Sequence, residues 1–558
     1  MPDGKKIIRR LVRVFSVITL LLLSFFIYLP IVSKTKPPTI VDSSALTWQR
    51  AEPSPGFYTL KNNWLRKSKS GLYEIYVEGQ PYERGVANGK LSRELIQLQE
   101  DYFNDQINKM IPSRFYLHFL KYIVGWFNRD LDKHVPEEYK EEIYGISASA
   151  SDKYNYIGSK YQRLLNYHAA HDIGHALQNL ALVGCTSFGT WGSRSADSNM
   201  IIGRNFDFYV GDHFSENKII AFENPTDGFR FMSVTWGGFI GVVSGMNEKG
   251  LTVTINAAKS DIPSGSATPV SIVAREILQY AENIPEALAI AKKRKMFVSE
   301  SFLIGSAEEG KAIIIEKTPD SVGVYDPGKN EIICANHFQS AALSTLPSNR
   351  LQIRQSASDY RYRRMQELLN ANPKNTVAKT VEILRDRGGM GDSDIGMGNE
   401  KSINQMIAHH SIIFEPQKKR VWVSTGPWQL GEFVCYDLEK VFSLKGMKIN
   451  QEIADSNLNL PADPFLETRQ FQKFLNFREY KKELLENIPV NPDTLIASNP
   501  SFYQSYELAG NEMFKQKKFP RAIIYYQQAL SKEIATKTEE NYIRNQISKC
   551  EEKIKRPV

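Results

Sequence analysis

The chain has 558 residues, which is long enough for two to four domains. Its composition, with 42% hydrophobic and 24% charged residues, is ordinary for a globular protein and excludes a largely disordered chain. The net charge is +8, and part of the excess is local, because basic residues crowd the N-terminus at Lys5, Lys6, Arg9, Arg10 and Arg13. This leaves little reason to expect a nucleic-acid partner, which would need a concentrated basic face.

Residues 14–33, VFSVITLLLLSFFIYLPIVS, form an apolar run without a charged residue. About 20 helical residues match the roughly 30 Å hydrocarbon core of a bilayer. The basic residues that precede the run favour a cytoplasmic location for residues 1–13. We therefore expect a single-pass anchor in the cytoplasmic membrane, with the rest of the chain on the extracytoplasmic side. A cleaved signal peptide is the alternative, although no clear small-residue cleavage site follows.

The remaining chain divides by pattern into segments. Residues 34–56 are rich in Pro and Ser and predict a linker. After short alternating runs near 57–80, helical periodicity predominates, so residues 57–184 predict a mainly helical N-terminal segment. Residues 185–445 alternate blocks of strand and helix patterns, which indicates an α+β catalytic domain.

Residues 455–558 form a Lys- and Glu-rich helical tail with few glycines. Aromatic and small residues within it stand where a tetratricopeptide repeat requires them: Tyr506, Gly510, Phe514, Ala522, Tyr526 and Ala529. One repeat cannot bury its own apolar face, so we expect packing against the main domain or the helix after residue 537. An ordinary helical hairpin is the alternative. The tail is the expected site for a protein partner.

Cys185 lies in LVGCTSF, where a helical pattern gives way to strand patterns. It follows Gly184, which tolerates strained backbone, and precedes two hydroxyl residues. A buried structural cysteine is the alternative interpretation. Arg204 and Asp207 follow in the strand-like MIIGRNFDF. Since they would face opposite sides of a regular strand, a bend or bulge is needed to bring both to one pocket, and a salt-bridged pair at a sheet edge is the alternative.

Other polar residues extend the set of candidates. Asn256 and Asn336 stand at strand ends, where amides commonly cap neighbouring backbone. Four residues of the kinds that bind metal ions would share one face of a helix: His168, His171, Asp172 and His175. The alternative is a helix that packs near the nucleophile with its polar groups satisfied locally, and we expect neither a metal nor a cofactor. The four cysteines are too few for a disulfide framework, although one pair could bond in an exported chain.

Three motifs in order, GRNFDFY, MNEKGLTVTINA and ANHF, resemble those of the choloylglycine hydrolase and penicillin V acylase family. GCTSF and ANHF are similar to motifs of the related acyl-coenzyme A:6-aminopenicillanic acid acyltransferase family. Both families are N-terminal nucleophile hydrolases, and the resemblance covers about residues 165–435. It implies an α+β fold in the form of a four-layer α-β-β-α sandwich of two packed antiparallel sheets.

The resemblance also implies the roles of individual residues. The nucleophile falls on Cys185, and because this cysteine does not follow the initiator methionine, the Gly184–Cys185 bond must be cut to expose it. The remaining family positions fall on Arg204 beside the sulfur, Asp207 beside the new amine, the oxyanion residues Asn256 and Asn336, and Arg361. Where the acyltransferase branch has Ser-x-x-Arg, this chain keeps Ser402 but has Gln405, which departs from the penicillin-type pattern.

The implied mechanism begins with attack of the Cys185 thiol on the Gly184 carbonyl, which gives a thioester that water resolves. The new α-amine, with an ordinary pKa near 7.7–8.0, then serves as the base, and Arg204 lowers the thiol pKa. We therefore expect a self-processing cysteine amidohydrolase or acyltransferase that acts on a linear N-acyl amide. The alternatives are a non-catalytic membrane-anchored envelope scaffold that binds partners through its tail, and a papain-like thiol protease that pairs Cys185 with His337.

Overall fold

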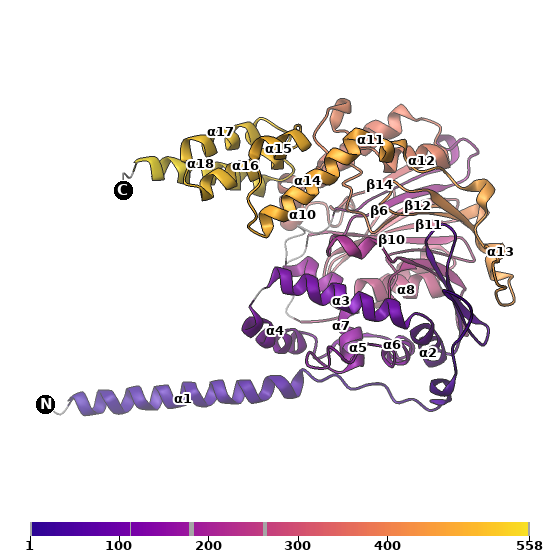
Figure 1. Ribbon diagram of the computed structural model, residues 1–558. Coiled ribbons are helices and arrows are strands. Elements are labelled where there is room, and N and C mark those ends of the chain that lie inside the picture. Colours follow the sequence, from indigo (N-terminus) through magenta and orange to yellow (C-terminus); the bar gives the residue numbers. More distant parts are fainter. Residues whose placement is uncertain (1–2, 112, 178–183, 260–264, 556–558) are drawn as a thin grey trace.

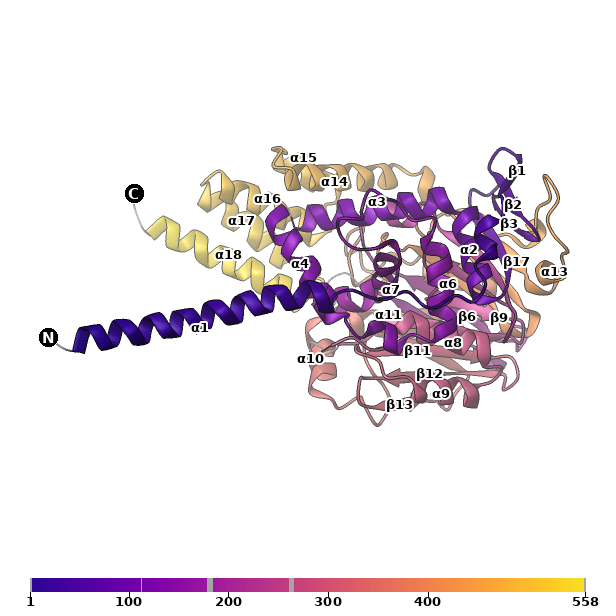
Figure 2. The ribbon, with the colours of Figure 1, turned by 90° about the horizontal axis from the view of Figure 1, so that it is seen from below.

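The computed structural model describes residues 3–111, 113–177, 184–259 and 265–555. Its body contains two stacked β-sheets with helices outside them, and a helix at each end of the chain projects from the body (Figure 1). The predicted mixture of helices and strands is confirmed. The helical tail projects from the same side of the body as the N-terminal helix, as the view in Figure 2 also shows.

The larger sheet has 11 strands, and it brings together residues from both sides of Cys185. In spatial order its strands are β1 (Ala51–Ser54), β2 (Phe57–Leu60), β3 (Asn63–Lys67), β4 (Tyr73–Gly79), β7 (Ile219–Pro225), β8 (Phe231–Thr235), β9 (Ser244–Asn247), β10 (Leu251–Ala257), β11 (Glu300–Ser306), β12 (Lys311–Lys317) and β13 (Val322–Tyr325). One part of the prediction is wrong, because the sheet is not wholly antiparallel: β4 and β7 pair in parallel, with Tyr73 opposite Ile219.

The smaller sheet has 6 strands. In spatial order they are β14 (Glu331–Cys334), β5 (Thr186–Thr190), β6 (Ile201–Phe206), β15 (His410–Glu415), β16 (Arg420–Ser424) and β17 (Phe433–Asp437). Every neighbouring pair in this sheet is antiparallel. Strand β5, which follows Cys185, pairs with β6 so that Ser187 lies opposite Arg204, and the chain after Cys185 is thus held in register with the predicted arginine.

Side-chain alternation explains why the two sheets stack. In β12, Ile313 and Ile315 join a hydrophobic cluster with the helices outside the larger sheet, whereas Ile314 joins the cluster between the two sheets. This is the period of two that a strand buried on both faces requires. A third cluster, which includes Phe188 and Met365, lies between the smaller sheet and its outer helices. The layers therefore follow the order helix, sheet, sheet, helix.

The helices divide between the two outer layers (Figure 1). The N-terminal half and the segment after β10 supply α2 (Pro81–Leu91), α3 (Arg93–Met110), α4 (Arg114–Phe127), α5 (Leu131–His134), α6 (Glu137–Ser147), α7 (Lys160–Leu177), α8 (Val270–Tyr280) and α9 (Ile284–Lys293). The other side of the body carries α10 (Pro347–Gln355), α11 (Ser358–Ala371) and α12 (Val377–Leu384). The short α13 (Leu438–Phe442) lies at the edge of the sheets and adds its apolar residues to the cluster between them.

The segment boundaries differ from the prediction at the N-terminal side. Strand β1 lies within residues 34–56, which were expected to form only a linker. Strands β2–β4 coincide with the alternating runs near 57–80, and α2–α7 make the rest of residues 57–184 mainly helical, as predicted. The physical reason is that these strands add to the edge of the larger sheet, where β3 and β4 bury Trp64 and Ile75. Short strands with this much buried side chain become stable only through such pairing.

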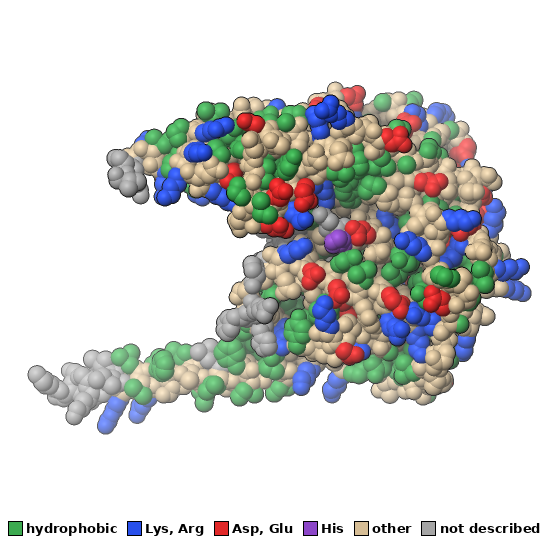
Figure 3. All heavy atoms as spheres, viewed as in Figure 1, with side chains coloured by type: hydrophobic (Ala, Val, Ile, Leu, Met, Phe, Trp, Pro, Cys, Tyr) green, Lys and Arg blue, Asp and Glu red, His purple; other side chains and the backbone are tan. Residues whose placement is uncertain are grey.

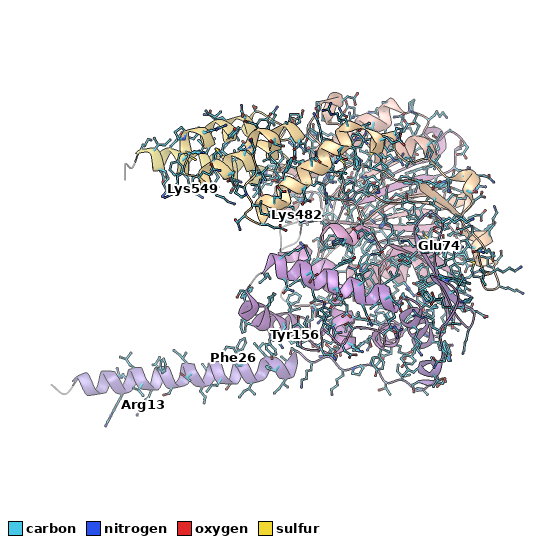
Figure 4. All side chains as sticks on the ribbon, in the orientation of Figure 1. Arg13, Phe26, Glu74, Tyr156, Lys482 and Lys549 are labelled. Carbon is cyan, nitrogen blue, oxygen red and sulfur yellow. The ribbon has the colours of Figure 1, made fainter. Side chains whose placement is uncertain are left out.

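The N-terminal helix α1 spans Asp3–Val32, and its segment Arg9–Val32 is long and apolar enough to cross a membrane. Figure 3 shows hydrophobic side chains along its length. Most of these side chains are exposed, and only the last turns touch the body, where Leu29 is buried. There the ring of Phe26, labelled in Figure 4, lies 6.1 Å from that of Phe119 in α4.

The tail is helical as predicted, with α14 (Arg469–Leu485), α15 (Pro492–Ser498), α16 (Tyr503–Lys515), α17 (Phe519–Leu530) and α18 (Lys537–Lys555). Gly510 lies against the ring of Tyr526, so closely that a Cβ there would come within 2.6 Å of a ring carbon. This contact lets α16 and α17 pack as a hairpin, and α18 completes their core by burying Ile543. Whether the hairpin is a tetratricopeptide repeat stays a prediction.

Candidate active site

Cys185 stands immediately before β5, at the head of the smaller sheet, and its side chain is 1% exposed. Its thiol donates a long hydrogen bond to the backbone oxygen of Asp207, with 3.8 Å between Sγ and O, and accepts one from the guanidinium of Arg204 at 3.6 Å. The amide nitrogen of Gly184 also donates to the oxygen of Asp207, at 2.9 Å. The sulfur and the backbone before it are thus held against the end of β6.

Arg204 lies within β6, fully buried, and its guanidinium reaches across to the larger sheet. Besides the sulfur, it donates to the backbone oxygen of Val243 at 2.9 Å, to that of Ile255 at 2.5 Å and to the hydroxyl of Ser244. An arginine tied to fixed acceptors from two strands has few alternative positions. The side chain therefore positions a permanent positive charge beside Cys185.

Asp207 follows the last residue of β6, Phe206, so the strand ends between the two charged residues. Asp207 thus lies just beyond the strand, where its backbone oxygen accepts from the Cys185 thiol to which Arg204 also donates. Both carboxylate oxygens of Asp207 are buried and have no hydrogen-bond partner among the described residues. Burial raises the pKa of Asp207 to about 7, against the opposing effect of Arg361 and Arg204.

The ionisation of the sulfur differs from the prediction. Burial raises the pKa of the Cys185 thiol to about 11, and the opposing effect of Arg204 is smaller. The carboxylates of Asp207 and Glu300 also raise this pKa. The arginine acts in the predicted direction, but the sequence could not show that the uncut chain encloses the sulfur completely. A thiol that is protonated at neutral pH needs a base to become a nucleophile.

Arg361, another of the predicted site residues, lies on α11 and contacts several of the others. Its guanidinium donates to the backbone oxygen of Cys185 and to the hydroxyl of Thr186, each at 2.7 Å. It also donates to the side-chain oxygen of Asn336 at 2.8 Å. The structure thus brings Cys185, Arg204, Asp207, Asn336 and Arg361 into one connected set of contacts.

The two asparagines hold neighbouring backbone in the uncut chain. Asn256 donates to the oxygen of Cys334 at 3.1 Å and accepts from Ser187 at 2.7 Å. The amide of Asn336 donates to the oxygen of Ala257 at 2.8 Å. These bonds link β10 to β14 beside the site. Each amide retains a second N–H, so the oxyanion role of both residues stays a prediction.

A further contact involves Gln405, the residue that stands in place of the family arginine. Its side-chain amide donates to the backbone oxygen of Gly184, with 2.7 Å between Nε2 and O. Gln405 is 2% exposed. The carbonyl before Cys185 therefore has a dedicated, buried hydrogen-bond donor 221 positions away in the sequence.

Two polar residues near the sulfur were not singled out from the sequence. Ser244 links Arg204 to His410, whose Nε2 lies 2.9 Å from the serine hydroxyl. Glu300 begins β11 and is fully buried, and neither of its carboxyl oxygens has a hydrogen-bond partner among the described residues. Burial raises the pKa of Glu300 well above its ordinary value. A carboxyl residue at the start of the apolar run SFLIGS is the signal that could have identified it.

The thiol-protease interpretation finds no support in the geometry. The ring of His337 lies with Nδ1 2.7 Å from the hydroxyl of Ser358, and this hydroxyl also accepts from the amide nitrogen of Asn336. Burial lowers the pKa of His337 to about 4. The hydrogen-bond neighbours of the Cys185 sulfur in the described chain are Arg204 and Asp207 instead.

The predicted histidine cluster is only partly described. The side chains of His171 and His175 lie outside the described residues, whereas His168 is fully buried and accepts from the amide nitrogen of Ile240 at 3.0 Å. Within the described ranges, no group of three or more His, Cys, Asp or Glu side chains could hold a metal ion. The four cysteines are buried and unbonded to one another: Cys185, Cys334, Cys435 and Cys550.

Two surface cavities lie away from the sulfur. One, of about 490 Å³, is lined by charged residues that include Arg364 and Asp463. The other, of about 500 Å³, lies beside Tyr280 and Arg294. Neither is lined by Cys185, which fits its near-complete burial in the uncut chain. We therefore locate the candidate site by its chemistry and not by the size of a cavity.

A cysteine at the head of a strand, in a body of two stacked sheets between layers of helices, is the arrangement of an N-terminal nucleophile hydrolase. Residues 194–427 match the acyl-coenzyme A:6-aminopenicillanic acid acyl-transferase family, which supports the predicted N-terminal nucleophile hydrolase type. The match covers less than half of the chain. It begins after Cys185 and includes the other predicted site residues, Arg204, Asp207, Asn256, Asn336 and Arg361.

The chain also has relatives of similar sequence. An uncharacterised protein of Archaeoglobus fulgidus is 28% identical over 262 residues, which cover 44% of this chain and 43% of that protein. Protein dcd1B of Dictyostelium discoideum is 23% identical over 271 residues, which cover 45% of this chain and 51% of the relative. The matches thus span about half the length of these curated relatives or less.

Solved structures of similar proteins include a Caenorhabditis elegans orthologue of N-acylethanolamine-hydrolyzing acid amidase, with 17% identity and a TM-score of 0.30. The similarity covers 42% of this chain and 93% of the amidase. A variant of conjugated bile acid hydrolase from Clostridium perfringens has 13% identity and a TM-score of 0.30, and covers 48% of this chain and 99% of its own. These scores describe a slight structural likeness.

Proposed function

We propose that this protein is a self-processing cysteine amidohydrolase or acyltransferase that acts on a linear N-acyl amide through a thioester on Cys185. The family match supports amide hydrolysis or acyl transfer as the chemistry. The observation that carries the proposal is the buried carboxylate of Asp207, which has no hydrogen-bond partner among the described residues although it lies beside Cys185. Cutting the Gly184–Cys185 bond would create an α-amine at this position.

An unpaired buried carboxylate costs free energy in the uncut chain, so it calls for a functional explanation. The amine of a new N-terminus is a hydrogen-bond donor. In its protonated form it would also supply a positive charge to pair with the Asp207 carboxylate. Because the pKa of Asp207 is raised to about 7, the same carboxyl can accept the thiol proton and return it near neutral pH. Asp207 therefore suits both the cut and the mature site.

The other residues complete the mechanism. Arg204 stabilises the thiolate once a base has taken the proton, because its guanidinium stays charged and touches the sulfur. In the mature enzyme the α-amine of Cys185 is the base, as in other enzymes whose nucleophile and base share one residue. The thioester formed from the substrate is then resolved by water, in hydrolysis, or by an acceptor amine, in transfer.

The surroundings of the site favour an apolar acyl group. Phe206 and Phe208 flank Asp207, and an aromatic cluster continues from them through Phe214, whose ring lies 5.0 Å from that of Trp236. Trp236 in turn stacks on Phe239 at 4.2 Å. Aromatic walls of this kind bind acyl chains through contact area rather than charge.

We also propose that α1 anchors the protein in the cytoplasmic membrane, with the catalytic body on the extracytoplasmic side. Its length and apolar composition, and the basic residues before it, support this location. The side of the body from which α1 projects would then face the bilayer, and the helical tail projects from that same side (Figures 1 and 2). The proposed partner site of the tail would then lie near the membrane.

A denaturing gel tests the self-cleavage. The wild-type protein should give two bands that correspond to residues 1–184 and 185–558, and Cys185→Ala should give one. Cys435→Ala is the matched control, because Cys435 is also buried but packs on the other face of the smaller sheet, and it should give two bands. A single band in the wild type would contradict the proposal and favour the scaffold alternative.

The substrate class can be identified by intact mass spectrometry. The mature protein is incubated with a panel of N-acyl amino acids, lactams and bile-salt conjugates, and the acyl adduct on Cys185 is measured. An adduct with one class of amide identifies the acyl group, and the released product then separates hydrolysis from transfer. Adducts on a cysteine other than Cys185 would contradict the assignment of the nucleophile.

A further inference from the structure

In the uncut chain the carbonyl of Gly184 accepts a hydrogen bond from Gln405. The family resemblance gives this residue no role in catalysis. Gln405 donates to this oxygen at 2.7 Å, and both residues are buried. The oxygen belongs to the peptide group that Cys185 would attack. A donor at this atom stabilises negative charge that develops there, and such donors are the largest single contribution in many acyl-transfer reactions.

The loop that carries Gln405 is built to hold it. The Ser402 hydroxyl lies 2.7 Å from the backbone oxygen of Asn399 and 2.8 Å from that of Asn404, and its single proton can be donated to either. The next residue after the glutamine, Met406, has a φ of 52°, a left-handed conformation that is uncommon for a residue with a side chain. The structure around it must stabilise this conformation, which orients the backbone at Gln405.

The contact with Gln405 also explains the glycine at position 184. A Cβ at this position would lie 2.5 Å from Oε1 and 2.6 Å from Nε2 of Gln405, closer than atoms of this kind can approach. A Cβ at position 184 would therefore displace the amide of Gln405 from its position at the carbonyl. The two residues are therefore matched to each other, although they are far apart in the sequence.

The bond to be cut is held from both ends. On one side the amide nitrogen of Gly184 donates to the oxygen of Asp207 at 2.9 Å. On the other, Arg361 donates to the oxygen of Cys185 at 2.7 Å. Asn256 and Asn336, by contrast, donate to other carbonyls, those of Cys334 and Ala257. Of the side chains described here, Gln405 is the one whose hydrogen bond reaches the Gly184 oxygen.

We propose that Gln405 is the oxyanion donor of the self-cleavage step. The inference rests on the proposed function. As the Cys185 sulfur bonds to the Gly184 carbon, the carbonyl electron pair moves to the oxygen, where the amide of Gln405 stabilises it. The carbon–nitrogen bond then breaks, and the proton that Asp207 took from the thiol passes to the Cys185 nitrogen. Water hydrolyses the thioester to a Gly184 carboxylate and a free thiol.

The test measures the rate of self-cleavage in Gln405→Leu. The full chain is synthesised in a cell-free system with detergent micelles, and the conversion to the two products is followed on a denaturing gel. Loss of one oxyanion donor slows the reaction about 10²–10³-fold, and we expect a decrease in rate of this size. Gln429→Leu is the matched control, because Gln429 is equally buried but its amide faces the oxygen of Leu384.

A second variant separates catalysis from folding. Gln405→Glu keeps the size and polarity of the side chain but lacks the N–H donor once its carboxyl is ionised. Its rate relative to the wild type should be lowest at pH 8 and should rise as the pH falls, because a protonated carboxyl can donate again. A side chain that only supports the fold would give the same ratio at every pH.

The outcomes distinguish this inference from the proposal on which it rests. If Gln405→Leu cleaves as fast as Gln429→Leu while Cys185→Ala stays uncut, the role of Gln405 is refuted and self-processing stands. If the wild type stays uncut, or if Cys185→Ala cleaves, the proposed function itself is refuted. A decrease of about 10²–10³-fold in Gln405→Leu, together with the pH-dependent ratio for Gln405→Glu, supports the inference.

Discussion

Replacement of Asp207 by asparagine separates the stability of the uncut chain from its reactivity. The carboxylate is buried without a hydrogen-bond partner among the described residues, and burial raises its pKa from 3.8 to about 7. A group whose pKa is higher in the folded than in the unfolded state holds more protons when folded. Its contribution to stability is therefore fully present below pH 4 and is lost as the pH rises through about 7.

The size of the effect follows from the shift in pKa. Each pKa unit corresponds to about 1.4 kcal/mol, so the shift of Asp207 costs the folded chain about 4 kcal/mol at pH 8 relative to pH 4. Asparagine has nearly the same shape as the protonated carboxyl and does not ionise. On a Cys185→Ala background, which prevents cleavage, Asp207→Asn should therefore stabilise the protein at pH 8 and leave it almost unchanged at pH 4.

Denaturant unfolding in detergent, at pH 4 and at pH 8, measures this difference. Both proteins carry the same remaining titratable groups, so the difference between the two pH values isolates Asp207. The same substitution in the wild-type background should prevent self-cleavage, because the proton acceptor is lost. A variant that is less stable than its parent at pH 8 would refute the reasoning, since the carboxylate would then have a partner that stabilises its charge.

Four further predictions follow from individual contacts. Gly184→Ala should slow self-cleavage at least about 10-fold and destabilise the chain by about 1–3 kcal/mol, because its Cβ would overlap Gln405. Gel kinetics measure the rate of cleavage and denaturant unfolding measures the stability. Cleavage at the wild-type rate would contradict the contact. Arg204→Lys should lower the free energy of unfolding by about 2–4 kcal/mol, because one ammonium cannot reach the carbonyls of Val243 and Ile255 and the Ser244 hydroxyl together. Denaturant unfolding measures this, and an unchanged midpoint would count against these bonds. His337→Ala should retain self-cleavage within a few-fold, since its ring contacts Ser358 and not the sulfur; complete loss in a folded variant would revive the thiol-protease alternative. A chain without residues 1–33 should leave the membrane fraction on alkaline extraction while the full chain stays, and equal extraction of both would contradict the anchor.

Local patterns in the sequence predicted much of the fold. KAIIIEK reads as a strand because alternate isoleucines serve two different layers, and the structure assigns Ile313 and Ile314 to different clusters. The blocks of strand and helix patterns predicted over residues 185–445 are likewise present, with α11 and α12 among the helices. The parallel pairing of β4 with β7 was not predictable in this way, because it joins segments about 150 positions apart through backbone bonds that leave no local signature.

In the candidate site, too, short motifs could be recognised in the sequence, whereas properties that depend on the folded chain could not. Cys185, Arg204 and Asp207 were identified from short motifs, and the structure brings them together. The high pKa of the thiol was missed, because complete burial is a property of the folded chain and not of the motif. Gln405 was noticed as a departure from a family pattern, but its contact with Gly184 depends on the path of a loop far along the chain.

The parallel pairing of β4 with β7 has a consequence for the mature protein. Strands β1–β4 precede the Gly184–Cys185 bond, whereas β7–β13 follow it, so one continuous hydrogen-bonded sheet crosses from one product of the cut to the other. After cleavage the two polypeptides would stay associated without a covalent link, through this seam and through helix contacts such as the ion pair between Glu142 in α6 and Arg275 in α8. The membrane helix would then hold the catalytic chain only through such non-covalent contacts. Salt or alkaline washes should then leave activity on the membrane, and urea should release it.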